Sequence, residues 1–373
     1  MRLLPISFIQ PGMRLGKPIV TEEGKTLLGY HVELTQGVLT RLRQMGFHQL
    51  YIEDPRTDDI RIEDPLREET RTLVRGNLLR IFQTMMSSGG ELSNTEKLMF
   101  AKAATQSVQG ILDDVQASSR PNDDTIVLMD LNRRSHSPME HFTQNAVNVC
   151  VYATRLGLTE RFTKDDLYAI ALGGMFHDIG NSLISPKLLQ KDSSLSPQEY
   201  SEIQKHTEYG YKILKELPGM PLLAAHCALQ HHEKFSGGGY PSGLSGSSIH
   251  SFAQWVGLLD AYDAMINPRP YRSAIPPDYA LEMLFAGAGT LYDKCKVEGF
   301  RNKVAIYPVG LSVRLSTGES GLVSRINHSY KQRPVVRVLT SPSGEDLKHP
   351  YEIDLSRHLH IMIFRVGEDA LVH

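Results

Sequence analysis

The stretch GMFHDIGN, residues 174–181, decides how the central part of the chain folds. It closes a helix expected over residues 164–179, and Gly180 marks the helix end. Successive residues on a helix point about 100° apart, so His177 and Asp178 can face one site only near such an end. The stretch therefore predicts a helix that ends by presenting an imidazole and a carboxylate together.

The composition is that of an ordinary globular protein. Of the 373 residues, 41% are hydrophobic and 22% are charged, and the formal net charge is −2. A general nucleic-acid binder carries a strongly basic surface, so this balance argues against that class. Cys150, Cys227 and Cys295 lie far apart, which predicts a reducing compartment without disulfides. Pro5 and Pro11 interrupt the first apolar run, so we expect no signal peptide, no membrane span and a cytoplasmic protein.

The chain divides into four expected parts, giving a multidomain α+β fold class. Residues 1–64 mix short β-like runs with one helix, as in a small α/β module. Residues 65–120 carry two apolar stripes at helical spacing, which predict a helical connector. Residues 121–305 predict an all-α domain, and residues 306–373 predict a small β-rich extension because polar and apolar residues alternate there. Helices of the all-α domain are expected at 141–156, 164–179, 197–217, 221–233, 252–266 and 277–292.

The two stripes of the connector permit two interpretations. Ser93 and Glu96 form the pattern of a capping box, which predicts the start of the second helix. The helices either join the first module to the next domain or form a dimer interface. We favour the joining role, and a homodimer stays open.

A second stretch, HHEKFSGGGYPSGL at residues 231–244, places two histidines before a loop that is rich in glycine. Adjacent histidines occur by chance, and a cluster of glycine and proline is usually a turn. Other residue types suited to metal binding recur on the separate expected helices. They are His136, His141, His206, Asp260 and Asp263.

The order of these motifs resembles the HD-GYP subgroup of the HD metal-dependent phosphohydrolases. HDIG at 177–180 is followed by His206, by HHE at 231–233 and by GGYP at 238–241. LLDAYDAM at 258–265 and RPYR at 269–272 complete the set. The resemblance covers roughly residues 132–307 and implies an HD-type helical domain. It further implies a bacterial enzyme that hydrolyses cyclic di-GMP to linear pGpG or GMP, and residues 1–64 resemble a module often found ahead of such domains.

The resemblance also implies a site with two metal ions, iron or manganese. The implied ligands are His141, His177, Asp178, His206, His231, His232 and Asp260. Asp178 would bridge both ions, and a hydroxide between them would attack phosphorus. Two octahedral ions need about twelve ligand positions, which these residues, the hydroxide and two phosphate oxygens would fill. Asp263 is expected to be structural.

The resemblance implies further residues that contact substrate. Arg269 and Arg272 match basic positions expected to meet phosphate, and Lys234 and Tyr240 belong to the loop beside the paired histidines. In the family this loop is linked to docking of diguanylate cyclase (GGDEF) domains, which makes such a domain an expected partner.

Two positions depart from the family pattern. Asn181 stands where the family usually has a lysine close to the reacting phosphate, so a catalytic position has lost its charge. Ser137 stands where members with three metals have a glutamate, which predicts two metals here.

Three functions therefore compete. The first is a metal-dependent cyclic di-GMP phosphodiesterase. The second is a cyclic-dinucleotide receptor with weak or no turnover, prompted by Asn181. The third is a phosphohydrolase of the wider HD superfamily that acts on mononucleotides, against which GGYP and RPYR argue.

Overall fold

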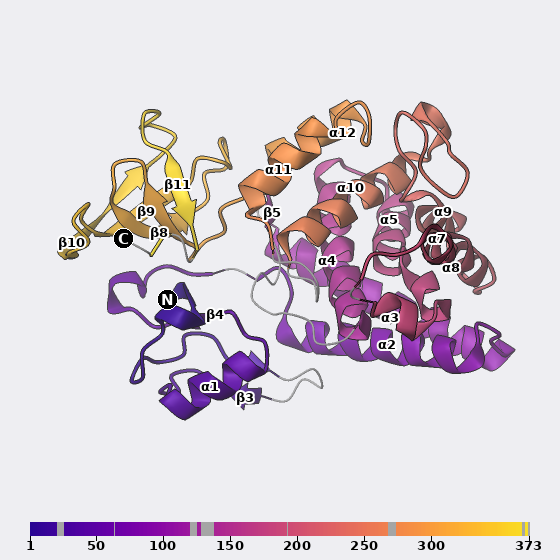
Figure 1. Ribbon diagram of the computed structural model, residues 1–373, viewed down its shortest axis with the longest axis horizontal. Coiled ribbons are helices and arrows are strands. Elements are labelled where there is room, and N and C mark those ends of the chain that lie inside the picture. The colour runs from indigo at the N-terminus through magenta and orange to yellow at the C-terminus, as the bar shows by residue number, and fades with distance from the viewer. Residues whose placement is uncertain are drawn as a thin grey trace. The chain divides into compact units, whose positions relative to one another are not determined.

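The computed structural model describes residues 1–20, 26–62, 64–119, 125–127, 138–191, 193–267, 274–367 and 370–371. These residues divide into two compact units. A helical unit lies within residues 65–301, and a terminal unit combines both ends of the chain with the short strand β5 (Ile126–Val127). The multidomain α+β fold class predicted from the sequence is confirmed (Figure 1).

The helical unit is built around α5 (Lys164–Phe176), whose residues from Ala169 onward are all buried. α4 (Pro138–Thr159) and α9 (Leu222–Gln230) pack against α5, and α10 (Ser251–Ile266) packs against all three. The remaining elements are α2 (Glu68–Ser88), α3 (Asn94–Ser118), η3 (Ile179–Leu183), α6 (Pro186–Leu189), α7 (Pro197–Gln204), α8 (His206–Lys215), η4 (Gly246–Ser248), α11 (Pro277–Ala286) and α12 (Lys294–Lys303). No helix in the described ranges has the length and apolar character that a bilayer crossing requires.

Two of the expected helices differ most from those in the structure. The helix expected over residues 197–217 is two helices, because the chain breaks at Lys205 between α7 and α8. The helix expected over residues 277–292 ends at Ala286, where the N–H of Gly287 bonds the carbonyls of the last turn. The sequence patterns also missed α12.

The two long helices α2 and α3 lie side by side, as Figure 1 shows, and both pack against α4. The capping box expected at the start of α3 is confirmed, since the Ser93 side chain and the Glu96 side chain each bond the other's backbone N–H. These helices therefore belong to the helical unit, while the division of the chain into four domains stays a prediction.

The terminal unit contains a five-stranded antiparallel sheet in the order β10-β9-β8-β7-β11. Its strands are β7 (Ser312–Leu315), β8 (Ser320–Arg325), β9 (Val335–Thr340), β10 (Asp346–Asp354) and β11 (Ile363–Val366). The other elements are β1 (Arg2–Pro5), η1 (Ile6–Phe8), β2 (Ile19–Val20), β3 (Thr26–Leu28), α1 (Gln36–Gln44), β4 (Gln49–Ile52), η2 (Pro55–Thr57), β5 and β6 (Val304–Ala305). β2 pairs with β3 in an antiparallel ladder.

The two ends of the chain are joined in this unit by backbone bonds and a shared core. The N–H of Leu3 donates to the carbonyl of Gly310 at 3.0 Å, and the hydroxyl of Ser312 donates to the carbonyl of Leu3 at 3.0 Å. Ile60 packs with Leu322 and Leu339 in one buried cluster. The expected N-terminal module and C-terminal extension thus form one structural unit.

Candidate metal centre

Four helix ends bring the candidate ligands of the helical unit together. His177 follows α5 directly, Asp178 precedes η3, and His206 is the first residue of α8. His231 and His232 come immediately after α9. One side-chain ligand atom from each of Asp178, His206, His231 and His232 lies within 4.8 Å of all the others, so a single ion fits among them.

Gly180 permits the close approach that builds this cluster. A Cβ on Gly180 would lie 1.9 Å from the carbonyl oxygen of His206 and 2.7 Å from the backbone nitrogen of Gly210. Both contacts are with backbone, which cannot move aside without displacing α8. The glycine of HDIG therefore sets the distance between η3 and the helix that carries His206.

Three imidazoles are held by the same arrangement. The Nδ1 atoms of His177, His206 and His231 lie 2.8, 2.7 and 3.0 Å from the carbonyl oxygens of Gly174, Ile203 and Ala228, respectively. A carbonyl oxygen can only accept, so each Nδ1 carries the hydrogen and donates it. In the neutral ring, Nε2 then keeps its lone pair, which is the form that binds a metal.

Asp178 lies among these Nε2 atoms. Its Oδ1 is 3.3 Å from Nε2 of His206 and 3.6 Å from Nε2 of His231, while its Oδ2 is 3.8 Å from Nε2 of His177. Burial alone would favour the neutral acid, but the imidazoles of these three histidines outweigh it and hold the pKa of Asp178 well below its usual range. The carboxylate is therefore charged and lies among three imidazole nitrogens.

His177 connects Asp178 to Asp260 on α10. Its Nε2 lies 3.5 Å from Oδ1 of Asp260, is fully buried, and makes no hydrogen bond in the part of the chain that the structure describes. Burial disfavours the charged imidazole, yet Asp178 and Asp260 together raise the pKa of His177 to about 9. A buried nitrogen without a hydrogen-bond partner, between two carboxylates, is the environment that a metal ion would satisfy.

Side-chain amides hold Asp260 and Asp263 in place. The Nδ2 group of Asn145 on α4 donates to Asp260 at 3.1 Å and to Asp263 at 2.9 Å. Asp263 also accepts from Asn148 at 2.9 Å and from Asn267 at 2.8 Å. Asp263 is almost fully buried, and its two oxygens accept three amide hydrogen bonds. The structure therefore gives Asp263 a supporting role, as expected, and leaves Asp260 facing His177.

The amide network makes a stability prediction for Asp263. The Asp263→Ala variant is expected to unfold with a free energy about 3 kcal/mol lower, because three amide groups, two of them on buried asparagines, lose their acceptor. Chemical denaturation of metal-free protein measures this difference. The matched control is Asp113→Ala, since Asp113 is an exposed carboxylate on α3 that accepts from Gln109, and its change is expected to stay within about 0.5 kcal/mol. An Asp263 variant as stable as this control would contradict the supporting role.

The structure describes some of the remaining candidate site residues and not others. His141 lies on α4 one turn before Asn145, and residues four apart share a helix face, so it projects from the face that reaches Asp260. Asn181 is buried in η3, three residues after Asp178. Lys234 is exposed at the turn after α9. His136, Ser137, Arg269 and Arg272 lie outside the described residues.

Tyr240 lies against the cluster. Its ring stacks on that of His232 with centroids 4.7 Å apart and meets the ring of His206 edge-on at 6.2 Å. Burial raises the pKa of Tyr240 above its usual value, so the phenol stays protonated near neutral pH. The predicted phenol is therefore beside the candidate ligands and remains a hydrogen-bond donor.

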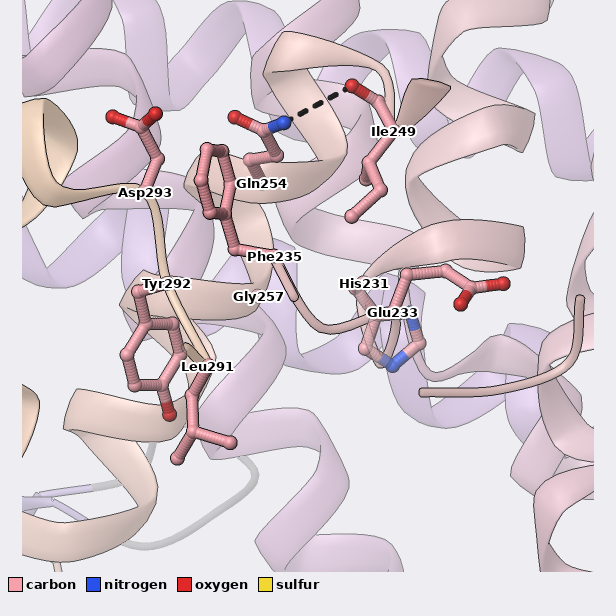
Figure 2. A pocket seen from close by; sticks show the side chains of 9 residues that line it. All are labelled: His231, Glu233, Phe235, Ile249, Gln254, Gly257, Leu291, Tyr292 and Asp293. Carbon is pink, nitrogen blue, oxygen red and sulfur yellow. Dashed lines mark hydrogen bonds between the residues drawn. The ribbon is translucent and has the colours of Figure 1, made fainter. Parts of the chain in front are cut away.

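His231 also lines a small cavity, and Figure 2 labels the residues around it. Its volume is about 20 Å³, which is room for roughly one water molecule and far too little for a nucleotide. Gln254 bonds the carbonyl of Ile249 at one side of it, while Leu291 and Tyr292 line another part (Figure 2). A dinucleotide would have to bind elsewhere on the cluster.

The sequence patterns missed the amides that support the aspartates. Asn145 lies four residues after His141, and this spacing on one helix was a usable signal. No local pattern announces that its partners are Asp260 and Asp263, because they lie more than one hundred residues further along the chain. Glu233 was also missed, although the HHE motif contains it. Its carboxylate accepts from the backbone N–H groups of Ser242 and Leu244 and is not among the clustered ligands.

Two regions of the chain match known families. Residues 135–295 match the HD domain, and residues 312–370 match the KOW domain associated with HD domain. The first region contains every residue of the cluster. The second covers the five-stranded sheet.

Curated relatives are named as phosphodiesterases of cyclic dinucleotides. A cyclic di-GMP phosphodiesterase of Pseudomonas aeruginosa is 28% identical over 68% of this chain and 60% of its own length. One of Thermotoga maritima is 35% identical over 40% of this chain and 39% of its own length. A 3'3'-cGAMP-specific phosphodiesterase of Vibrio cholerae is 32% identical over 39% of this chain and 31% of its own length.

The chain thus spans between about a third and three fifths of the length of these relatives. The region that matches the HD domain contains the HDIG, HHE and GGYP motifs, which meet in the folded chain. Residues 135–295 therefore form an HD domain, and the ordered motifs and the cluster that they build support the HD-GYP family.

Proposed function

We propose that the protein is a metal-dependent phosphodiesterase that hydrolyses cyclic di-GMP to linear pGpG or GMP. The observation that carries this proposal is the cluster of Asp178, His206, His231 and His232, whose ligand atoms all lie within 4.8 Å of one another. The names of the curated relatives support the substrate class. A site rich in imidazole with an aspartate suits iron or manganese.

We propose that the site holds two metal ions. The four clustered residues together with His141, His177 and Asp260 would bind them, and Asp178 would serve both. When bound, the ions would neutralise negative charge on the phosphate and lower the pKa of a water molecule that serves as nucleophile. The two carboxylates favour the protonated ring of His177, and binding of an ion would release that proton because a ligating nitrogen needs its lone pair.

The protein's own groups would orient the histidine rings and exclude water. Backbone carbonyls fix the rings of His177, His206 and His231 so that each Nε2 faces the site. These carbonyls belong to Gly174, Ile203 and Ala228. The buried position of His177 and His231 keeps bulk water from behind the cluster. We propose that Arg269, Arg272 and Lys234 meet the phosphates and that the phenol of Tyr240 donates a hydrogen bond or stacks on a base.

One experiment tests the proposal directly. Protein loaded with Mn²⁺ would be incubated separately with cyclic di-GMP, 3'3'-cGAMP and a 5'-mononucleotide, and the metal content of the same sample would be measured. We expect hydrolysis of cyclic di-GMP and about two ions per chain. Asp178→Asn supplies the matched inactive variant. The 3'3'-cGAMP arm addresses the other substrate found among the relatives' names.

Each result of this experiment has a definite meaning. Hydrolysis of the mononucleotide alone would place the protein with the wider HD superfamily. Less than one tightly bound ion per chain, in protein prepared with ample iron and manganese, would overturn the metal site. Tight binding of cyclic di-GMP without turnover would support the receptor alternative instead of the enzyme.

Asn181 is the residue that motivates the receptor alternative. It is buried close to Asp178, at the position where the family usually has lysine. Asn181→Lys is expected to raise turnover of cyclic di-GMP about tenfold or more, because an ammonium group in a partly dry site favours the more negative transition state. Steady-state rates at matched metal loading measure this. An unchanged or lower rate in a folded, fully metallated variant would show that Asn181 does not limit turnover.

Three finer expectations accompany the proposal. The loop of residues 234–244 would dock a diguanylate cyclase domain, the protein would pair as a homodimer, and it would act in the cytoplasm. Each stays a prediction.

A further inference from the structure

His232 differs from the other clustered histidines in how its ring is held. Nδ1 of His177, His206 and His231 each meets a backbone carbonyl. Within the described ranges, the ring of His232 makes no hydrogen bond, and its contacts are with other rings. Something other than a carbonyl must therefore fix its orientation.

The ring of Tyr240 stacks on one face of the His232 ring. The two rings are nearly parallel, at 29°, and their centroids are 4.7 Å apart. The ring of His206 stands edge-on to both, 5.1 Å from His232 and 6.2 Å from Tyr240. Stacking of this kind restricts rotation of an imidazole about its side-chain bonds, because any turn loses contact area.

The backbone holds Tyr240 in this position by folding over the histidines. The N–H of Tyr240 bonds the carbonyl of His232 at 3.3 Å. A Cβ on Gly239 would lie 2.4 Å from the nitrogen of Lys234, 2.5 Å from Cα of Glu233 and 2.6 Å from the carbonyl of His232. Only glycine permits the loop to lie this close to the residues that it covers.

Glu233 fastens the far side of the same loop. Its Oε1 accepts from the N–H of Ser242 at 2.8 Å and its Oε2 accepts from the N–H of Leu244 at 2.9 Å. The residue is buried, and no Lys or Arg in the described part of the chain pairs with it. Both oxygens are thus committed to backbone, in bonds that the negative charge strengthens.

We infer that Glu233 and Tyr240 are positioning residues for His232, with Glu233 clamping the loop and Tyr240 orienting the imidazole for metal binding. This inference rests on the proposed metal site. The adjacent residues of the HHE motif then have separate roles: His231 and His232 face the metal, while Glu233 holds the loop that keeps His232 in place. Partners of this kind typically change metal affinity about 10- to 100-fold.

The test measures binding of Mn²⁺ to metal-free protein by titration calorimetry. Tyr240→Leu removes the stacked ring and is expected to weaken Mn²⁺ binding about 10- to 100-fold. Tyr240→Phe keeps the ring and is expected to bind within about twofold of wild type, since the hydroxyl has no part in the stack. Glu233→Gln keeps the shape but replaces one acceptor by a donor, so it should weaken binding in the same direction as Tyr240→Leu.

Two further variants make the result specific. Tyr211→Leu is the matched control, because Tyr211 packs against His226, which is outside the cluster, with centroids 5.4 Å apart. It should bind Mn²⁺ like wild type. His231→Ala tests the metal site itself and should lose most of the binding.

The outcomes test the proposed metal site and the positioning roles of Glu233 and Tyr240 separately. Wild-type affinity in His231→Ala would overturn the metal site. Loss of binding in His231→Ala with wild-type affinity in Tyr240→Leu and Glu233→Gln would overturn only the positioning inference. If Tyr240→Leu fails to fold, the Mn²⁺ affinities of Glu233→Gln and Tyr240→Phe are compared instead. Equal affinities of these two variants would refute the inference.

Discussion

Asp178→Asn is expected to lose most of its bound metal and to lower kcat/KM for cyclic di-GMP about 1,000-fold or more. The amide has the shape of the carboxylate but no charge, and the three nearest Nε2 atoms all lie within 3.8 Å of the original oxygens. The charge that would be shared by two ions is therefore removed without a cavity. Elemental analysis and steady-state hydrolysis on one preparation measure both effects.

The control for this variant is Asp165→Asn, an exposed aspartate in the first turn of α5. It should keep wild-type metal content and activity, since it lies at the opposite end of the helix that precedes His177. Asp263→Ala gives a second comparison, because it should retain more metal than Asp178→Asn. Equal metal loss in the two variants would mean that the roles assigned to Asp178 and Asp263 are wrong.

Gly180→Ala is expected to lower the free energy of unfolding by about 4 kcal/mol. The added methyl would lie 1.9 Å from a backbone oxygen of α8, and backbone on both sides blocks an easy shift. Because α8 begins with His206, the variant should also bind Mn²⁺ more weakly wherever it remains folded. Urea denaturation and metal titration provide the two measurements.

Gly76→Ala is the natural comparison within the same unit. Gly76 lies in the interior of α2, and a Cβ there would meet no atom within 4 Å. Alanine should raise the stability by about 0.5–1 kcal/mol through its better helix propensity. If Gly180→Ala were also as stable as wild type or more so, η3 and α8 could move apart at little cost in free energy.

The sequence predicted, to within about one helical turn, where two of the helices that carry candidate ligands end. Gly180 signalled that the helix before HDIG stops, and α5 ends at Phe176. His231 and His232 were expected at a helix end, and α9 ends at Gln230. These predictions succeeded because helix ends are encoded by nearby residues.

Features that depend on distant residues could not be predicted in this way. The break at Lys205 has neither glycine nor proline to announce it, although it places His206 at the start of α8. The bonds from Asn145 to two aspartates of α10 cross more than one hundred residues. Periodicity reports which face of a helix is apolar but not which amide meets which carboxylate.

The joining of the chain's two ends in one unit was also beyond local patterns. Leu3 and Gly310 are paired by backbone hydrogen bonding, and nothing in either neighbourhood specifies the other. Each segment was correctly expected to contain strands. Only the folded chain shows that Ile60 completes its core with Leu322 and Leu339.

Because the terminal unit combines both ends of the chain, its two parts are synthesised at different times. The N-terminal module contributes a cluster in which Leu4, Leu15 and Leu39 are buried, and these residues are synthesised first. The helical unit is synthesised next and is complete before the strands that cover Ile60 have been translated. Ile60 therefore lacks its packing partners Leu322 and Leu339 throughout the synthesis of the helical unit.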